Sequence, residues 1–122
     1  MYSCQKKISM RFKNIVVMAD FGSTGLWRKS KNSLCGTMIE YEYLDLSENL
    51  IKRFKDWIQL YDKTFILLAI GETKSISKIK VEKVKKMGHE LAIELKKKYP
   101  DLKILYYSED CYGHTSKPKE IL

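Results

Sequence analysis

Two groups of polar residues stand where apolar runs of the chain end, and their side chains are of the types that bind cations. The first run ends at Asp20, and Ser23 follows in a loop with two glycines, whereas a later run leads into Glu109 and Asp110. If both runs are parallel strands, their carboxyl ends meet at the sheet edge where open α/β folds bind ligands. Carboxylate and hydroxyl oxygens would suit a divalent cation there. The alternative, which we favour because acids commonly end strands, is ordinary loop chemistry.

No spacing of nucleophiles, bases or metal ligands points to catalysis. The loop at residues 22–25 lacks the lysine and the length of a phosphate-binding P-loop. His89 falls within a helical pattern and His114 near the C-terminus, and neither forms a recognisable pair with Cys35 or Cys111. We therefore predict no catalytic residues, no bound metal and no cofactor, and we expect that the protein is not an enzyme.

Positive charge is the strongest compositional signal. The 122 residues include 23 Lys and Arg against 15 Asp and Glu, a formal net charge of +8. Such a surplus favours an anionic partner, which is nucleic acid, a membrane surface or an acidic protein, although it also fits a lysine-rich proteome. Many of these cations fall in one helical segment: Lys78, Lys80, Lys83, Lys85, Lys86, Lys96, Lys97 and Lys98. No aromatic residues alternate with them, so a solvated helix face explains them better than stacking on single-stranded nucleic acid.

A second basic group follows Trp27. Arg28, Lys29 and Lys31 lie in a polar stretch without periodicity, which predicts an exposed loop. Trp27 lies outside any amphipathic stripe and has two interpretations, since it either closes the end of the sheet or anchors a protein partner. We predict that a partner binds through Trp27 and these three basic residues.

Three segments have the pattern of strands. Residues 14–20 form a continuous β-branched apolar run, which predicts a strand covered on both faces. Residues 102–107 predict the last strand of the chain. Residues 37–43 alternate apolar and acidic side chains, which predicts an edge strand with Glu40 and Glu42 facing water.

Two amphipathic helices are expected between the first and last of these strands. Ser47 is a good N-cap, and apolar residues recur after it with helical spacing: Leu50, Ile51, Phe54, Trp57, Ile58 and Tyr61. A second helix is predicted over residues 81–98 and ends before Pro100. The apolar residues 65–70 suit either a buried strand or a continuation of the first helix.

The order of these elements predicts an α/β or α+β domain. A strand, two helices and another strand require a crossover, so we expect the first and last strands to be parallel neighbours. The predicted architecture is a small mixed sheet of three or four strands covered by two main helices. We expect one domain over residues 11–112, a loose leader over 1–10 in which Met10 is an alternative start, and a flexible tail over 113–122.

The cysteines and the hydropathy pattern indicate the compartment. Cys4, Cys35 and Cys111 are three in number and lack the spacing of zinc ligands, so reduced thiols are the simplest interpretation. No apolar run approaches the roughly 18–20 residues of a membrane span, and the lysines near the N-terminus have no apolar segment beside them. We predict a cytoplasmic protein that does not enter a membrane.

Several separated blocks resemble a family of small bacterial immunity proteins. These blocks are residues 20–27, residues 44–47, Trp57 with Tyr61, residues 88–92, and Tyr106 with Tyr107. Across residues 11–110 the chain is similar to α/β immunity proteins encoded in polymorphic-toxin and contact-dependent growth inhibition loci. The basic stretch at residues 28–32 and the apolar segment at residues 65–70 depart from the family pattern.

The resemblance implies that the chain binds and neutralises a cognate toxin domain in the cytoplasm, and a basic inhibitor would match an acidic face on that toxin. One alternative is a nucleic-acid-associated protein that uses the lysine-rich helix face and binds any duplex with a steep salt dependence. A second alternative is a small metal-dependent enzyme built on Asp20, Glu109 and Asp110. This enzyme would show a cation-dependent thermal shift that Asp20→Asn abolishes.

Overall fold

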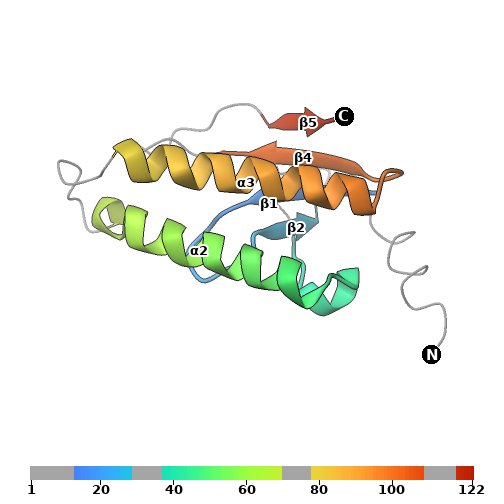
Figure 1. Cartoon of the computed structure of the whole chain (residues 1–122), viewed down its shortest axis with the longest axis horizontal. Coiled ribbons are helices and arrows are strands. Elements are labelled where there is room, and N and C mark those ends of the chain that lie inside the picture. The colour runs from blue at the N-terminus through green and yellow to red at the C-terminus, as the bar shows by residue number, and fades with distance from the viewer. Residues whose placement is uncertain (1–12, 29–36, 70–77, 109–117) are drawn as a thin grey trace.

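Five strands of the described chain form one mixed sheet, and the computed structural model describes residues 13–28, 37–69, 78–108 and 118–122. The strands are β1 (Asn14–Met18), β2 (Leu26–Arg28), β3 (Thr37–Met38), β4 (Lys103–Tyr107) and β5 (Lys119–Ile121). The helices are the 3₁₀ helix η1 (Tyr41–Leu44), α2 (Glu48–Ala69) and α3 (Lys78–Lys98). The strands lie in the order β3-β2-β1-β4-β5, and Figure 1 labels four of them, β2, β1, β4 and β5. The fold is α+β, with a mixed sheet packed against two helices.

The parallel pairing predicted for the first and last apolar strands is confirmed. β1 and β4 are neighbours and run parallel, with Val16 opposite Leu105 and Met18 opposite Tyr107. Between them the chain passes through both long helices, which provide the crossover that parallel strands require. The pairs β1–β2, β2–β3 and β4–β5 are antiparallel.

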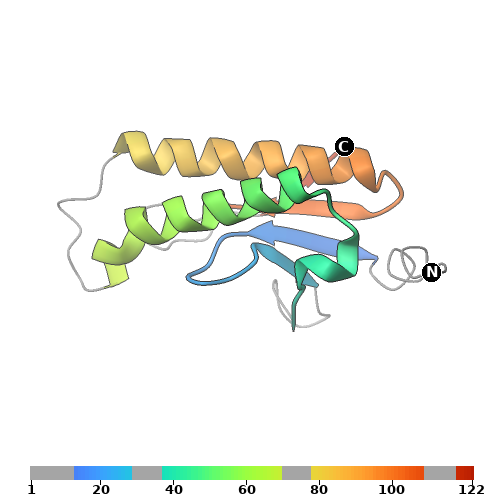
Figure 2. The same ribbon diagram turned by 60° about the horizontal axis from the view of Figure 1, so that its bottom comes forward.

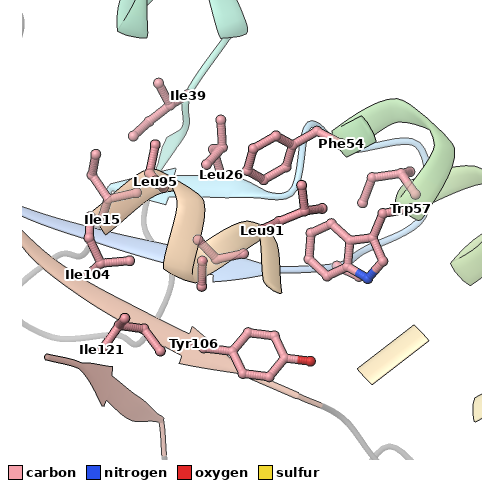
Figure 3. Close-up of a cluster of buried hydrophobic side chains, with 14 of the residues drawn as sticks. Ile15, Leu26, Ile39, Phe54, Trp57, Leu91, Leu95, Ile104, Tyr106 and Ile121 are labelled. Atoms are coloured by element: carbon pink, nitrogen blue, oxygen red, sulfur yellow. The ribbon is translucent and has the colours of Figure 1, made fainter. Parts of the chain in front are cut away.

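Both long helices lie on the same side of the sheet (Figure 2). Helix α3 contacts β1, β4 and β5, and α2 packs beside α3. Apolar side chains from both helices and the sheet meet between them (Figure 3), among them Ile15, Leu26, Phe54, Trp57, Leu91, Leu95, Ile104 and Tyr106. Within the described residues, no helix combines the length and the apolar character needed to cross a membrane.

Helix α2 begins where the sequence predicts and extends further. The Oγ of Ser47 accepts a hydrogen bond of 3.1 Å from the N–H of Leu50, which caps the first turn. The helix continues through Phe65, so the segment at residues 65–70 is helical as far as it is described. Phe65 is buried and stacks on Tyr61 with 4.7 Å between ring centroids. The apolar stripe therefore continues for another turn, which favours helix over strand.

Two of the five strands of the described sheet were not recognisable from the sequence, which predicts three or four. β2 follows the glycine loop directly after β1 and pairs back onto it. β5 lies inside residues 113–122, where a tail was predicted, and pairs with β4. Each has only three residues, and such short strands carry too little periodicity to be recognised without their partners.

The prediction of an edge strand over residues 37–43 is correct only for residues 37 and 38. β3 ends at Met38, and η1 begins at Tyr41. The Tyr41 hydroxyl donates a hydrogen bond of 2.9 Å to the carbonyl of Thr24, and Leu44 is completely buried in the core. An extended strand would alternate side chains across the sheet, whereas this 3₁₀ turn brings Leu44 into the core before α2 begins.

The sheet face opposite the helices carries a second, smaller apolar cluster. Val16, Met18, Leu105 and Tyr107 are buried on this face, and Trp27 packs against them. Alternate residues of β1 therefore point to two different buried clusters, because successive side chains of a strand face opposite sides. This confirms that the first apolar run is a strand covered on both faces.

Candidate functional site

The turn after β1 uses its polar groups to stabilise itself. Oδ1 of Asp20 accepts a hydrogen bond of 2.8 Å from the N–H of Phe21. The carbonyl of Asp20 accepts from both the N–H and the hydroxyl of Ser23. The Ser23 oxygen in turn accepts from the N–H of Gly25 at 3.1 Å. Asp20 and Ser23 therefore form a local turn network.

The crevice predicted at Asp20, Ser23, Glu109 and Asp110 stays a prediction. The carboxyl ends of β1 and β4 do lie at the same edge of the sheet, as the parallel pairing requires. Glu109 and Asp110 lie outside the described residues. In the part of the chain that is described, no three His, Cys, Asp or Glu side chains are grouped so that they could hold a metal ion.

Trp27 and Arg28 lie next to each other on β2, with different surroundings. The indole N–H of Trp27 donates a hydrogen bond of 2.8 Å to the carbonyl of Met18, and its half-buried ring packs on the smaller apolar cluster. These contacts fit the interpretation that Trp27 closes this part of the sheet. Arg28 is exposed, and Lys29 and Lys31 lie outside the described residues. The partner surface assigned to these four residues stays a prediction.

Trp57 determines how closely α2 and α3 approach each other. Its Nε1 donates a hydrogen bond of 3.0 Å to the carbonyl of Val84 on α3. A Cβ at Gly88 would lie 2.6 Å from the Trp57 ring and 2.8 Å from the Tyr106 ring. A Cβ at Gly25, which has a φ of +82°, would also lie 2.6 Å from the Trp57 ring. The indole fits because both glycines lack side chains, and this packing fixes α3 over the sheet.

A hollow of about 470 Å³ opens between the first half of α3 and the end of the β4–β5 pair. Its lining comes from these elements: Glu82, Lys85, Lys86, His89, Tyr106, Ser108 and Lys119. The four residues from α3 recur at intervals of three, one and three, so they share one face of the helix. Lys119 stands opposite Tyr106 in the β4–β5 register, and directly opposed side chains lie on the same face of a sheet.

Tyr106 connects the helix wall of this hollow to its floor. Its hydroxyl donates a hydrogen bond of 2.9 Å to the carbonyl of Lys85, and its ring centroid lies 5.7 Å from that of His89. Burial raises the pKa of the Tyr106 phenol well above its ordinary value of 10.0, and a hydrogen bond with Ser108 opposes the increase. The phenol therefore remains protonated at neutral pH.

The hollow is positively charged because three lysines and one glutamate line it. Lys86 and Lys119 are exposed, and Lys85 is half-buried. The Glu82 carboxylate lies 3.9 Å from the Lys85 ammonium, and the Glu82 side chain is 74% exposed. Exposed ion pairs of this kind contribute about 0–1 kcal/mol, so this contact holds Lys85 only weakly.

The lysine-rich face predicted for the second helix is divided in the structure. At the C-terminal end of α3, Lys96 donates hydrogen bonds to the carbonyls of Pro100 and Leu102 at 2.9 and 2.7 Å. Lys97 lies 3.5 Å from the Glu94 carboxylate. Lys96 thus serves the helix end, whereas Lys85 and Lys86 of the first half line the hollow. The lysines of α3 therefore do not all serve one surface.

The hollow could not be predicted from the sequence. The spacing of Glu82, Lys85, Lys86 and His89 was visible, and it marks a polar helix face beside the apolar stripe. Lys119 could not be added to that face from the sequence, because the strand that carries it was not recognised.

Together, the described elements define a small α+β domain with a basic surface hollow. Residues 13–109 match the family CdiI_serr, described as Serratia CdiI immunity protein-like. This match covers most of the chain, so the protein belongs to this CdiI immunity protein-like family, and the family predicted from the sequence is confirmed. Comparison with curated proteins and with solved structures gave no significant match.

Proposed function

We propose that this protein binds and neutralises a cognate toxin domain in the cytoplasm, and that it does so without catalysis. The observation that carries the proposal is the family match over residues 13–109, which includes the parallel strand pair and both long helices. Neutralisation by binding needs a surface complementary to the toxin. The net charge of +8 supports an acidic toxin face, because complementary charge accelerates association and excludes wrong partners.

The first toxin-binding surface in this proposal consists of Trp27, Arg28, Lys29 and Lys31. Arg28 is exposed at the end of β2, and part of the Trp27 ring is accessible beside it. The indole N–H already donates to Met18 within the chain. Trp27 would therefore contribute apolar contact to the toxin, and the basic residues would contribute charge.

Growth rescue tests the function directly. A candidate toxin domain, taken from a reading frame adjacent to the gene of this protein, is expressed from an inducible promoter, with and without this protein. We expect this protein to restore growth and to form a stoichiometric complex with the purified toxin domain in gel filtration. A toxin domain from an unrelated locus is the specificity control. Undiminished toxicity in the presence of the folded protein, together with the absence of a complex, would refute the proposal.

A triple substitution tests the first surface. Replacing Arg28, Lys29 and Lys31 by alanine should weaken toxin binding and reduce its dependence on salt. The matched control removes three exposed lysines from α2: Lys52, Lys55 and Lys63. If the first variant and the control bind equally well at every salt concentration, toxin does not bind through this surface.

A further inference from the structure

We infer that the basic hollow between α3 and the β4–β5 pair receives acidic side chains of the toxin domain. This inference rests on the proposed function and adds to it a second contact surface and the chemistry of its partner. The hollow is built by α3, β4 and β5, whereas Trp27 and Arg28 lie on β2. The two surfaces can therefore be tested separately.

The shape of the hollow suits side chains that project from another protein. Its volume of about 470 Å³ falls within the range of roughly 300–1,000 Å³ that is typical of pockets for small ligands. The polar groups that line it come from a helix wall and from a sheet edge. An inserted carboxylate would thus meet donors from two directions, which fixes its position better than a flat lysine surface does.

The charges of the hollow select a carboxylate. Lys85 and Lys86 project from α3, and Lys119 lies on the edge strand β5. Ammonium groups form charge-assisted hydrogen bonds with carboxylates, which are stronger than those between neutral groups. The one acidic group in the lining, Glu82, makes only a long ion pair with Lys85 at 3.9 Å. Toxin carboxylates would replace this contact with shorter ones.

The hollow is also held in shape before any partner arrives. The hydrogen bond from Tyr106 to the carbonyl of Lys85 joins β4 to α3. One helical turn further on, Gly88 packs against the rings of Trp57 and Tyr106. Binding then costs little conformational entropy in the backbone that carries the lysines, and preorganisation of this kind increases affinity.

The same features favour an acidic protein over nucleic acid. Binding along a phosphate backbone uses a row of cations, but Lys96 at the far end of α3 is engaged by two backbone carbonyls. Base stacking requires accessible aromatic rings, but Tyr106 is only 8% exposed, and the half-buried His89 ring packs beside it with 5.7 Å between the ring centroids.

A double charge reversal, Lys86→Glu with Lys119→Glu, tests the inference. Both side chains are exposed, so we expect an unchanged circular dichroism spectrum and thermal midpoint. The affinity for the purified toxin domain, measured by titration calorimetry, should fall by about tenfold or more. The matched control reverses two exposed lysines on α2, Lys55 and Lys63, and should retain most of the affinity. The milder variant Lys85→Gln should bind with intermediate affinity.

The outcomes separate this inference from the proposed function. If the wild-type protein binds the toxin and the double reversal binds equally well, the hollow is not a contact surface although the function stands. If both double reversals lose affinity equally, only the net charge matters and the hollow has no special role. If the wild-type protein does not bind the toxin at all, the proposed function fails and this inference fails with it.

A peptide probe gives a second measurement that does not need the toxin. Fluorescein-labelled hexaglutamate should bind the wild-type protein and the α2 control, and should lose binding in the variant with Lys86→Glu and Lys119→Glu. A short DNA duplex should compete poorly for the same site at moderate salt. If the duplex binds more tightly than hexaglutamate and through the same lysines, the hollow binds nucleic acid and the inference is overturned.

Discussion

Trp57 shows how a single residue links the three parts of this fold. Its ring lies against Gly25 after β1 and against Gly88 on α3, and its N–H donates to the carbonyl of Val84. The two glycines serve different purposes. Gly25 needs a positive φ of +82° as well as space, whereas Gly88 lies in regular helix and needs only space. Helical spacing in the sequence places Trp57 in a core stripe but does not identify the residues that it contacts.

We predict that Gly88→Ala destabilises the protein by about 1–3 kcal/mol, as overpacked cores do. Alanine is intrinsically better than glycine in a helix by about 1 kcal/mol, so the two effects oppose each other. Steric overlap should dominate, because the added Cβ would lie 2.6 and 2.8 Å from two buried rings. Urea unfolding measures the difference, with Glu90→Ala on the exposed side of α3 as control. An increase in stability would show that the rings move aside easily.

Ionisation of the Asp62 side chain is less favourable in the folded protein than in the unfolded chain. Burial raises the pKa of its carboxyl above the ordinary value of 3.8, the N–H of Gly22 opposes the increase with a hydrogen bond, and Asp20 adds repulsion. The native state therefore binds the proton more tightly than the unfolded state. By linkage, this group makes folding less favourable as the pH rises above 3.8.

We therefore expect Asp62→Asn to raise the thermal midpoint at neutral pH. The amide removes the charge and keeps a carbonyl oxygen that can accept from Gly22. The advantage should shrink on acidification to about pH 3, where the wild-type carboxyl is itself protonated. Scanning calorimetry across this range measures the effect. A stabilisation of the same size at both ends of the range would mean that the charge of Asp62 is not its cause.

At the scale of elements, the sequence predicted the long pieces and missed the short ones. The helices and β1 and β4 were recognisable because each contains enough residues to show a period or a continuous apolar run. The strands β2 and β5 are held by pairing with β1 and β4, so their stability is set by residues distant in the sequence. The strand predicted over residues 37–43 also failed because contacts distant in the sequence decide the structure. Burial of Leu44 in the core outweighs the local alternation of apolar and acidic side chains that favours a strand.

The end of α3 provides a test at this scale. Lys96 donates to two carbonyls beyond the helix, those of Pro100 and Leu102, and so connects the helix end to the start of β4. We predict that Lys96→Met, which retains most of the aliphatic chain, destabilises the protein by about 1–2 kcal/mol. Lys97→Met is the matched control and should change stability by less than about 0.5 kcal/mol, because its pair with Glu94 is exposed. Equal effects in urea unfolding would contradict the assignment.

At the scale of the whole molecule, the net positive charge was predictable from the sequence, whereas the distribution of the lysines over the surface was not. The surplus of lysine was plain from composition, and so was its concentration in the second helix. The sequence does not show which lysines stabilise the end of α3 and which line the hollow. The hollow depends on the pairing of β5 with β4, in which Lys119 stands opposite Tyr106. A helical pattern alone cannot contain that information, because Lys119 comes from β5, a strand that was not recognised.

The net charge of +8 leads to a last prediction, about the kinetics of toxin binding. Raising the salt from about 0.05 to 0.5 M shortens the range of electrostatic attraction from over 10 Å to a few ångströms. The association rate constant should then fall by on the order of tenfold or more, because steering acts before contact. The dissociation rate should change much less, since short-range contacts hold the complex together. Stopped-flow mixing with the toxin domain measures both rates, with the variant Lys86→Glu plus Lys119→Glu for comparison.

That variant carries less positive charge, so its association should depend less on salt. It should also dissociate faster if the hollow holds toxin carboxylates. An association rate that is independent of salt would show that the toxin face is not acidic.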